Sequence, residues 1–447
     1  RAQGMDNFEK AIRVVFTQGP SVTPEVREQA TSYCDAIKAR PDSWRFCWDQ
    51  FVNRNCLEVR FWCLQVITSA IPSISAHDRL ELRGKLLCWL RDAVPDKQED
   101  VAIRNKIALV YVGMLKCDYP ASWTTGWVDL LGLLDRGPNL VDVFLRVQAT
   151  FDQEIVSDDV PRSAEDRQLS QMIKHAMREA DVAKLAECWY SILLTFRHSA
   201  PQLVADCLKV VGSYVVWVDI YTIANDRFLD AICSIIEEAG PASSDACDCL
   251  GAVLGKKMGA GRKVQMLLQL RVLGRLEACM HRQSADLQLI EKEAELFNSV
   301  GEVLMEAYME LREQPRQDAE GAKQAEAAWG LLKSLMPSIF WFFSHQEYQI
   351  ADSVEPLLTQ FFARIRAFAD TGANDEEFCD SSEGPCHTVG MPQLRPILMQ
   401  TLQLIIQRIA YPDWFCHNDP SCEEDERHIA FLEFRRSLVK IYRRIFL

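Results

Sequence analysis

The sequence predicts an all-α protein, a right-handed α-solenoid (superhelix) built from HEAT-type helical hairpins. Apolar residues recur at steps of three or four along most of the chain, and no segment shows the alternation typical of a strand. The expected helices also form pairs that occupy around 40 residues each, the period of HEAT-type repeats. Because no short signature recurs from pair to pair, a tandem of helical bundles is the alternative architecture.

The stretch Cys207–Asp230 shows the helical pattern most clearly. Its first helix carries one apolar stripe, which three valines widen, so we expect burial on two sides. The stripe consists of Leu203, Cys207, Val210, Tyr214 and Trp217, and the valines are Val211, Val215 and Val218. Asp219 and Asn225 can each accept a hydrogen bond from a free backbone N–H, so we expect the chain to turn there and begin a second helix. Such a pair is the unit of an α-solenoid.

The other helices are expected from the same periodicity, and Pro24 and Pro41 favour the starts of the first two. The first paired segments are 24–38, 41–51, 58–71, 79–94, 101–117 and 123–134, followed by 141–156, 166–196, 243–258 and 262–281. Longer helices are expected at 286–313, 319–343, 346–368, 394–409 and 424–446. The acidic segments 370–392 and 411–425 are too polar to form packed structure, so we expect solvated loops or contacts for a basic surface.

Composition limits the classes of function. The formal net charge of −14 argues against a protein that coats itself in nucleic acid, because phosphate binding depends on lysine and arginine, so any RNA site must be a local patch. The sixteen cysteines lie mostly in apolar stripes, where free thiols behave as small hydrophobes, which indicates a reducing compartment. No apolar run approaches the roughly 18 to 20 residues of a membrane span.

No catalytic arrangement is found in the sequence. Serine, histidine and aspartate occur without a nucleophile elbow, and Gly259–Arg262 lacks the Gly-Lys-Ser/Thr end of a phosphate-binding loop. Zinc-type ligands are present without a C-x2-C pair, and they are Cys379, Cys386, His387, Cys416, His417, Cys422 and His428. Cys247 and Cys249 stand two apart on a helix and are expected to be core thiols. We therefore predict no enzyme activity, no metal and no cofactor.

Several segments resemble the exportin-T family, the tRNA carriers of the importin-β (karyopherin) superfamily. They are PDSWRFC from Pro41, VRFWCLQVI from Val59, IRNKIALV from Ile103, VDVFLRVQATFDQEIV from Val141, CWYSIL from Cys188, VVGSYVVWVDIYTIANDRF from Val210 and DACDCLGAVLGKKM from Asp245. The resemblance is to the N-terminal half of the family. It implies importin-β-like HEAT repeats with a Ran-binding surface at 5–135, exportin-like repeats at 136–283 and further helical repeats at 284–447.

The resemblance also implies a function. A member of this family is a nuclear export receptor that binds tRNA cooperatively with GTP-bound Ran, contacts nucleoporins of the nuclear pore, and shuttles between nucleus and cytoplasm as a monomer without membrane insertion. Two alternatives stay open: a Ran-dependent carrier for another cargo, either a protein or another small RNA, and a Ran-independent helical scaffold.

Candidate contact residues follow from the resemblance and from charge. Polar residues on the early helices are candidates for Ran binding, and they are Arg45, Asp49, Arg79, Arg83 and Asp129. Two basic clusters are candidates for tRNA binding: Lys256, Lys257, Arg262 and Lys263 at one inter-helix turn, and Arg435, Arg436, Lys440 and Arg443, with Arg444 beside them, on the last helix. All of these residues have the alternative of being ordinary solvated charges, and basic residues near a helix C-terminus are favoured by the helix dipole.

Overall fold

A computed structural model describes residues 7–17, 22–95, 97–157, 160–280, 286–313, 319–372, 391–412, 415 and 426–446. Among them it contains helices, turns and no strand. The chain divides into two compact units, Arg1–Val210 and Val211–Leu447, and we describe each by itself. The predicted blocks 5–135, 136–283 and 284–447 stay predictions. No helix in the described ranges is long and apolar enough to cross a membrane.

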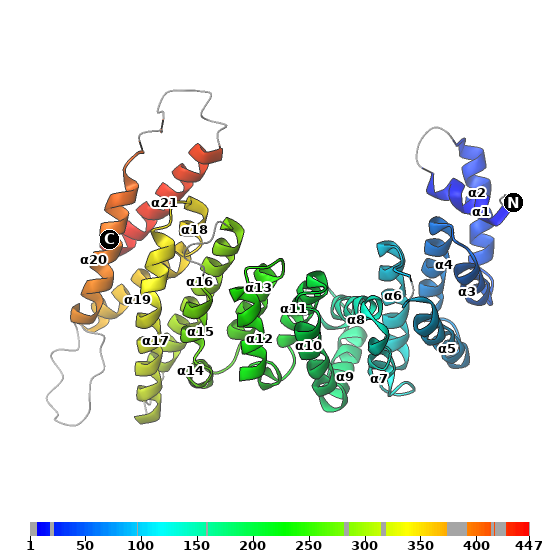
Figure 1. Cartoon of the computed structure of the whole chain (residues 1–447), viewed down its shortest axis with the longest axis horizontal. Coiled ribbons are helices and arrows are strands. Elements are labelled where there is room, and N and C mark those ends of the chain that lie inside the picture. Colours follow the sequence, from blue (N-terminus) through cyan, green and yellow to red (C-terminus); the bar gives the residue numbers. More distant parts are fainter. Residues whose placement is uncertain are drawn as a thin grey trace. The chain divides into compact units, whose positions relative to one another are not determined.

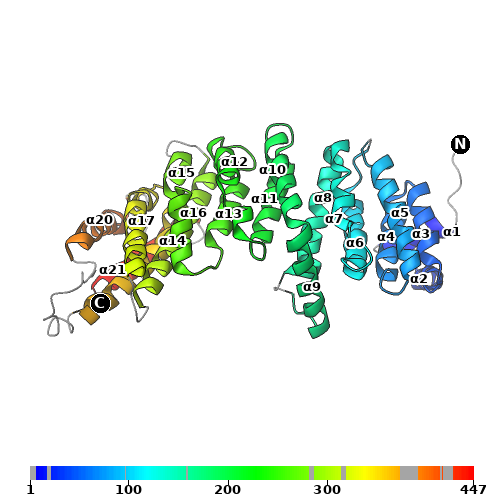
Figure 2. The same ribbon diagram turned by 90° about the horizontal axis from the view of Figure 1, so that it is seen from below.

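Unit 1 is a succession of antiparallel helices, each lying beside its neighbours in the chain (Figure 1). Helix α3 packs on α4, α4 on α6, and α6 on α8, and Figure 2 shows the same order from below. The elements are α1 (Asn7–Phe16), α2 (Pro24–Lys38), α3 (Ser43–Asn53), α4 (Leu57–Ala70), α5 (Ala76–Ala93), α6 (Val101–Asp118), α7 (Gly126–Leu131), η1 (Leu134–Arg136), α8 (Pro138–Phe151), the π-helical turn η2 (Asp152–Val156), α9 (Ala164–Ala180), α10 (Val182–Thr195) and most of α11 (Pro201–Val215).

Unit 2 continues with helices that pack in the same neighbour-to-neighbour manner, with α16 against both α13 and α17. Its elements are η3 (Ile220–Thr222), α12 (Asp226–Glu237), α13 (Ser243–Gly255), α14 (Ala260–Gln269), α15 (Val272–Cys279), α16 (Leu287–Glu313), α17 (Ala319–Phe343), α18 (Tyr348–Asp352), α19 (Glu355–Gly372), α20 (Met391–Ile409) and α21 (Glu426–Phe446). The predicted all-α, solenoid-type fold is confirmed. Most of both acidic segments, 373–390 and 416–425, lies outside the described residues.

Local sequence explains several helix starts. Thr23 accepts a hydrogen bond from the backbone N–H of Val26, and Pro24 occupies the first helical position of α2. Both residues proposed for the turn after α11 act as caps: Asp219 accepts from the N–H of Tyr221, and Asn225 accepts from the N–H of Phe228. The apolar residues predicted for two sides of α11 and its following turn are buried, as expected for an inner helix of the array.

The structure breaks three of the expected segments. The stretch 166–196 is two helices, which meet where α9 ends at Asp181. The stretch 262–281 is also two, because Arg271 adopts a left-handed conformation (φ 49°) between α14 and α15. The helix expected from Trp123 begins only at Gly126, and the Trp123 indole N–H donates to Asp129 across this turn at 2.7 Å.

Buried ion pairs connect consecutive hairpins of unit 1 at a constant sequence spacing. In each pair the arginine precedes its carboxylate by 38 or 39 residues, and the pairs are Arg60–Glu99, Arg79–Asp118 and Arg104–Asp142. All six side chains are at most 15% exposed. The spacing equals one hairpin, so the 40-residue period that no sequence signature marks is present in the polar contacts.

Candidate partner and nucleic-acid interfaces

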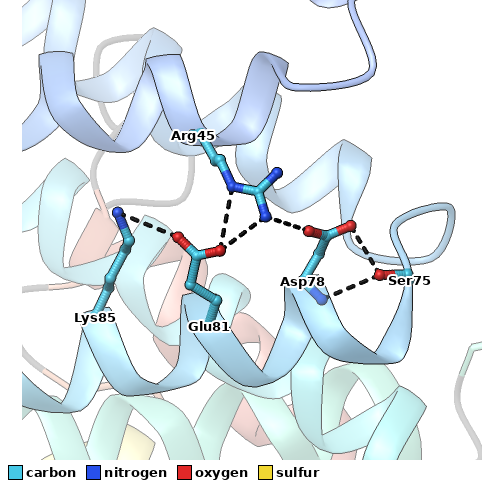
Figure 3. Close-up of polar contacts among 5 residues, drawn as sticks. All are labelled: Arg45, Ser75, Asp78, Glu81 and Lys85. Carbon is cyan, nitrogen blue, oxygen red and sulfur yellow. Dashed lines mark hydrogen bonds and ion pairs between the residues drawn. The ribbon is translucent and has the colours of Figure 1, made fainter.

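Arg45 of α3 is a candidate Ran contact whose guanidinium binds α5. It donates to Asp78 at 2.5 Å and to Glu81 at 2.7 and 3.2 Å, and Figure 3 shows it between the two carboxylates. Ser75 caps α5 and shares the Asp78 carboxylate, while Lys85 lies 3.5 Å from Glu81. The hydrogen bonds from Arg45 lower the pKa of Glu81. Because the Arg45 side chain is still 40% exposed, its pairing costs little to rearrange.

Three other Ran candidates support the fold around one tryptophan or one ion pair. Arg79 donates to Asp118 and to the carbonyl of Ile74 and is largely buried. The Arg83 guanidinium lies 4.9 Å from the centre of the Trp123 ring, and Asp129 accepts from the indole N–H of the same residue. The structure thus brings Arg83 and Asp129 together.

Asp49, the fifth Ran candidate, lies on α3 and is exposed. Together with Arg45, it leaves charge at the surface of the first hairpins. Arg79 and Asp129, by contrast, have their charged groups directed to partners within the unit.

The basic cluster between α13 and α14 divides into internal and external lysines. Lys256 donates to the carbonyls of Val215, at 2.8 Å, and Val218. Lys263, 4% exposed, donates to the carbonyls of Leu254, at 2.5 Å, and Lys256. Burial, with Lys256 nearby, lowers the pKa of Lys263 to about 8. Both ammonium groups therefore lie at helix carboxyl ends, where positive charge is stabilising.

Lys257 and Arg262 of the same cluster are exposed. They flank the turn between α13 and α14, whose inner side is held by the two internal lysines. Of the four predicted residues, these two present their charge to solvent.

The basic residues of α21 form a second exposed cluster. Arg435 is directed inward: its Nε donates to the carbonyl of Ile409 at 3.1 Å, and its guanidinium lies over the Tyr411 ring. Arg436, Lys440 and Arg443 are exposed, as is Arg444 beside them. An open groove runs along this helix, lined by Leu432, Arg435, Arg436, Val439, Lys440 and Arg443.

Sequence reasoning missed Asp78 and Glu81, which hold Arg45, and the carboxylates that pair with Arg60 and Arg104. The signal that would have found them is opposite charge about one hairpin further along the chain.

Of the zinc-type ligands weighed above, only His428 belongs to the described residues. Its ring is buried and stacks on Phe415 at 3.9 Å between centroids. Across the described ranges, no three histidine, cysteine or acidic side chains gather in a way that would hold a metal ion.

Comparisons with known proteins point to one family. A family described as Exportin 1-like protein matches residues 100–250. Exportin-T of Dictyostelium discoideum is 29% identical over 99% of this chain, which covers 38% of that protein. Exportin-T of Arabidopsis thaliana is 25% identical over 99% of the chain and covered to 43%, and that of Danio rerio is 32% identical over 65%, covered to 31%.

The chain is a homologue of exportin-T. This exportin-T homologue matches the N-terminal part of its relatives, as the sequence predicted. It spans about two fifths of the length of the Dictyostelium and Arabidopsis proteins.

Proposed function

We propose that the protein is a nuclear export receptor that binds tRNA cooperatively with GTP-bound Ran, contacts nucleoporins and shuttles between nucleus and cytoplasm. The observation that carries this proposal is the similarity to exportin-T proteins along 99% of the chain. The protein acts by binding and not by catalysis.

Cooperative loading requires that each ligand favours the other equally. Ran can promote tRNA binding only as much as tRNA promotes Ran binding, because the two affinities are linked. An array in which each hairpin contacts mainly its neighbours suits such coupling, since small rotations between hairpins add up.

We assign Ran to the surface of the first hairpins of unit 1. Arg45 and Asp49 have exposed charge on α3, and Arg83 is a partly exposed guanidinium held flat against Trp123. Arg79 and Asp129 serve the same surface from within, by fixing α5 and the turn before α7.

We assign tRNA to the exposed cations of unit 2. Lys257 and Arg262 at the α13–α14 turn are two of them, and the others are Arg436, Lys440 and Arg443 on α21. Phosphate binding by such residues releases counterions, so it must weaken as salt increases. Lys256, Lys263 and Arg435 contribute by holding the backbone that carries these side chains.

The test measures binding of labelled tRNA to the protein with and without GTP-locked Ran, at two salt concentrations. We expect tRNA to be held only with Ran present and to be lost at higher salt. Arg262→Glu should weaken binding and reduce the salt dependence by about one phosphate contact. Lys333→Glu, the same kind of charge change at an exposed site on α17, is the matched control and should leave binding unchanged.

Two other results would redirect the assignment. Failure to bind Ran refutes the carrier proposal and leaves a Ran-independent helical scaffold. Ran binding without tRNA binding leaves a Ran-dependent carrier of another cargo.

A further inference from the structure

Two cysteines, far apart in sequence, meet between α12 and α15 in unit 2. Cys233 and Cys279 are 5% and 4% exposed. The Sγ of Cys279 lies 3.5 Å from the carbonyl oxygen of Cys233 and 3.8 Å from a carboxylate oxygen of Glu237, one turn further along α12. The two thiols therefore face each other across a helix–helix contact.

An ion-pair cluster next to the thiols holds these two helices in register. Arg275, one turn before Cys279, donates to Asp226 at 2.6 Å and to Asp230 on α12. Because α12 and α15 are fixed at this point by charged hydrogen bonds, the approach of the two sulfur atoms belongs to the packing of the unit.

The two thiols have different reactivity. Cys279 donates a hydrogen bond to the sulfur of Cys233, and this bond, with help from the Arg275 charge, lowers the pKa of Cys233. The same bond, together with burial, raises the pKa of Cys279. Since the thiolate is the nucleophile in disulfide exchange, Cys233 is the attacking residue and Cys279 the resolving one.

A second pair of buried cysteines provides an internal comparison. Cys47 of α3 and Cys63 of α4 are both fully buried, and their mutual hydrogen bond raises the pKa of Cys63. This pair has less access to solvent than the α12–α15 pair, so an oxidant should reach it more slowly.

We propose that Cys233 and Cys279 form a reversible disulfide that fastens α12 to α15. With glutathione disulfide as oxidant, the Cys233 thiolate attacks one sulfur and releases one glutathione thiolate. The Cys279 thiol then loses its proton, attacks the Cys233 sulfur and releases the second glutathione. Two protein thiols become one disulfide, and two molecules of glutathione are formed.

The disulfide would close a loop that contains α13 and α14 and therefore the turn with Lys257 and Arg262. Closing this loop restricts the positions of both exposed cations. That effect on tRNA rests on the proposed function, whereas the disulfide itself does not.

The experiment exposes the native protein to glutathione disulfide or diamide, alkylates the remaining thiols, and maps peptides by mass spectrometry without reduction. We expect a Cys233–Cys279 linkage that dithiothreitol reverses. It should be absent from Cys233→Ser and Cys279→Ser and present in Cys47→Ser. The wild-type protein alone decides the matter if a variant fails to fold.

The proposal is overturned if exposed Cys88 and Cys117 are oxidised while no Cys233–Cys279 linkage forms, or if it forms only in denaturant. Binding of tRNA before and after oxidation tests the restriction of the turn separately. A protein that never binds tRNA fails the proposed function, while its peptide map still decides the disulfide.

Discussion

Replacing Glu99 with alanine should destabilise unit 1 by about 3 to 5 kcal/mol, the usual cost of leaving one partner of a buried ion pair. The Arg60 side chain is 10% exposed and that of Glu99 9%. The guanidinium forms two parallel bonds to the carboxylate, at 2.5 and 2.9 Å, and its third bond is to the carbonyl of Phe51. Without Glu99, two donors of a buried cation lose their acceptor.

The assay is urea unfolding followed by tryptophan fluorescence, because seven of the eleven tryptophans lie in unit 1. Asp35→Ala is the control. It breaks the Lys38–Asp35 pair, whose side chains are 48% and 59% exposed, and should cost less than about 1 kcal/mol. The double variant Arg60→Leu/Glu99→Leu should recover most of the loss, since apolar side chains of similar volume need no partner. If Glu99→Ala costs no more than the control, the reasoning about buried pairs between hairpins is wrong.

Burial raises the pKa of Glu302 above its ordinary value of 4.5, so ionisation at neutral pH costs stability; Glu302→Gln should raise the urea midpoint at pH 7, and the gain should vanish as pH falls below 4.5. An equal gain at pH 4 would contradict this. Lys263→Met should cost about 1 to 3 kcal/mol, because two buried carbonyls lose their donor, whereas Lys257→Met should leave the midpoint unchanged. Asn225→Ala should cost about 1 kcal/mol as a lost N-cap, and Asn225→Asp, which keeps the cap, should restore most of it.

Much of the helical architecture could be predicted from periodicity and punctuation. The expected segments 24–38 and 319–343 agree with α2 and α17 to the residue, because proline and cap residues or a long apolar stripe mark them. The break at Arg271 could not be predicted, since an arginine has no intrinsic preference for a left-handed conformation and tertiary packing imposes it.

The charged surface was less predictable for the same kind of reason. Lys256 and Lys257 are adjacent in sequence and equivalent in composition. Only the packing of α13 shows that the first meets carbonyls 38 and 41 residues earlier while the second is exposed. Sequence alone identifies where cations gather, whereas the fold decides which of them have a partner.

The spacing of the buried arginine–carboxylate pairs also bears on how the protein is made. Because each arginine of unit 1 waits only 38 or 39 residues for its carboxylate, a hairpin can complete its polar contacts as soon as the next hairpin has been synthesised. Newly made segments therefore spend little time with a buried cation lacking its partner, which is the state that favours misfolding and aggregation in long chains. The ribosome can release this array one hairpin at a time, each hairpin fastened to the one before it.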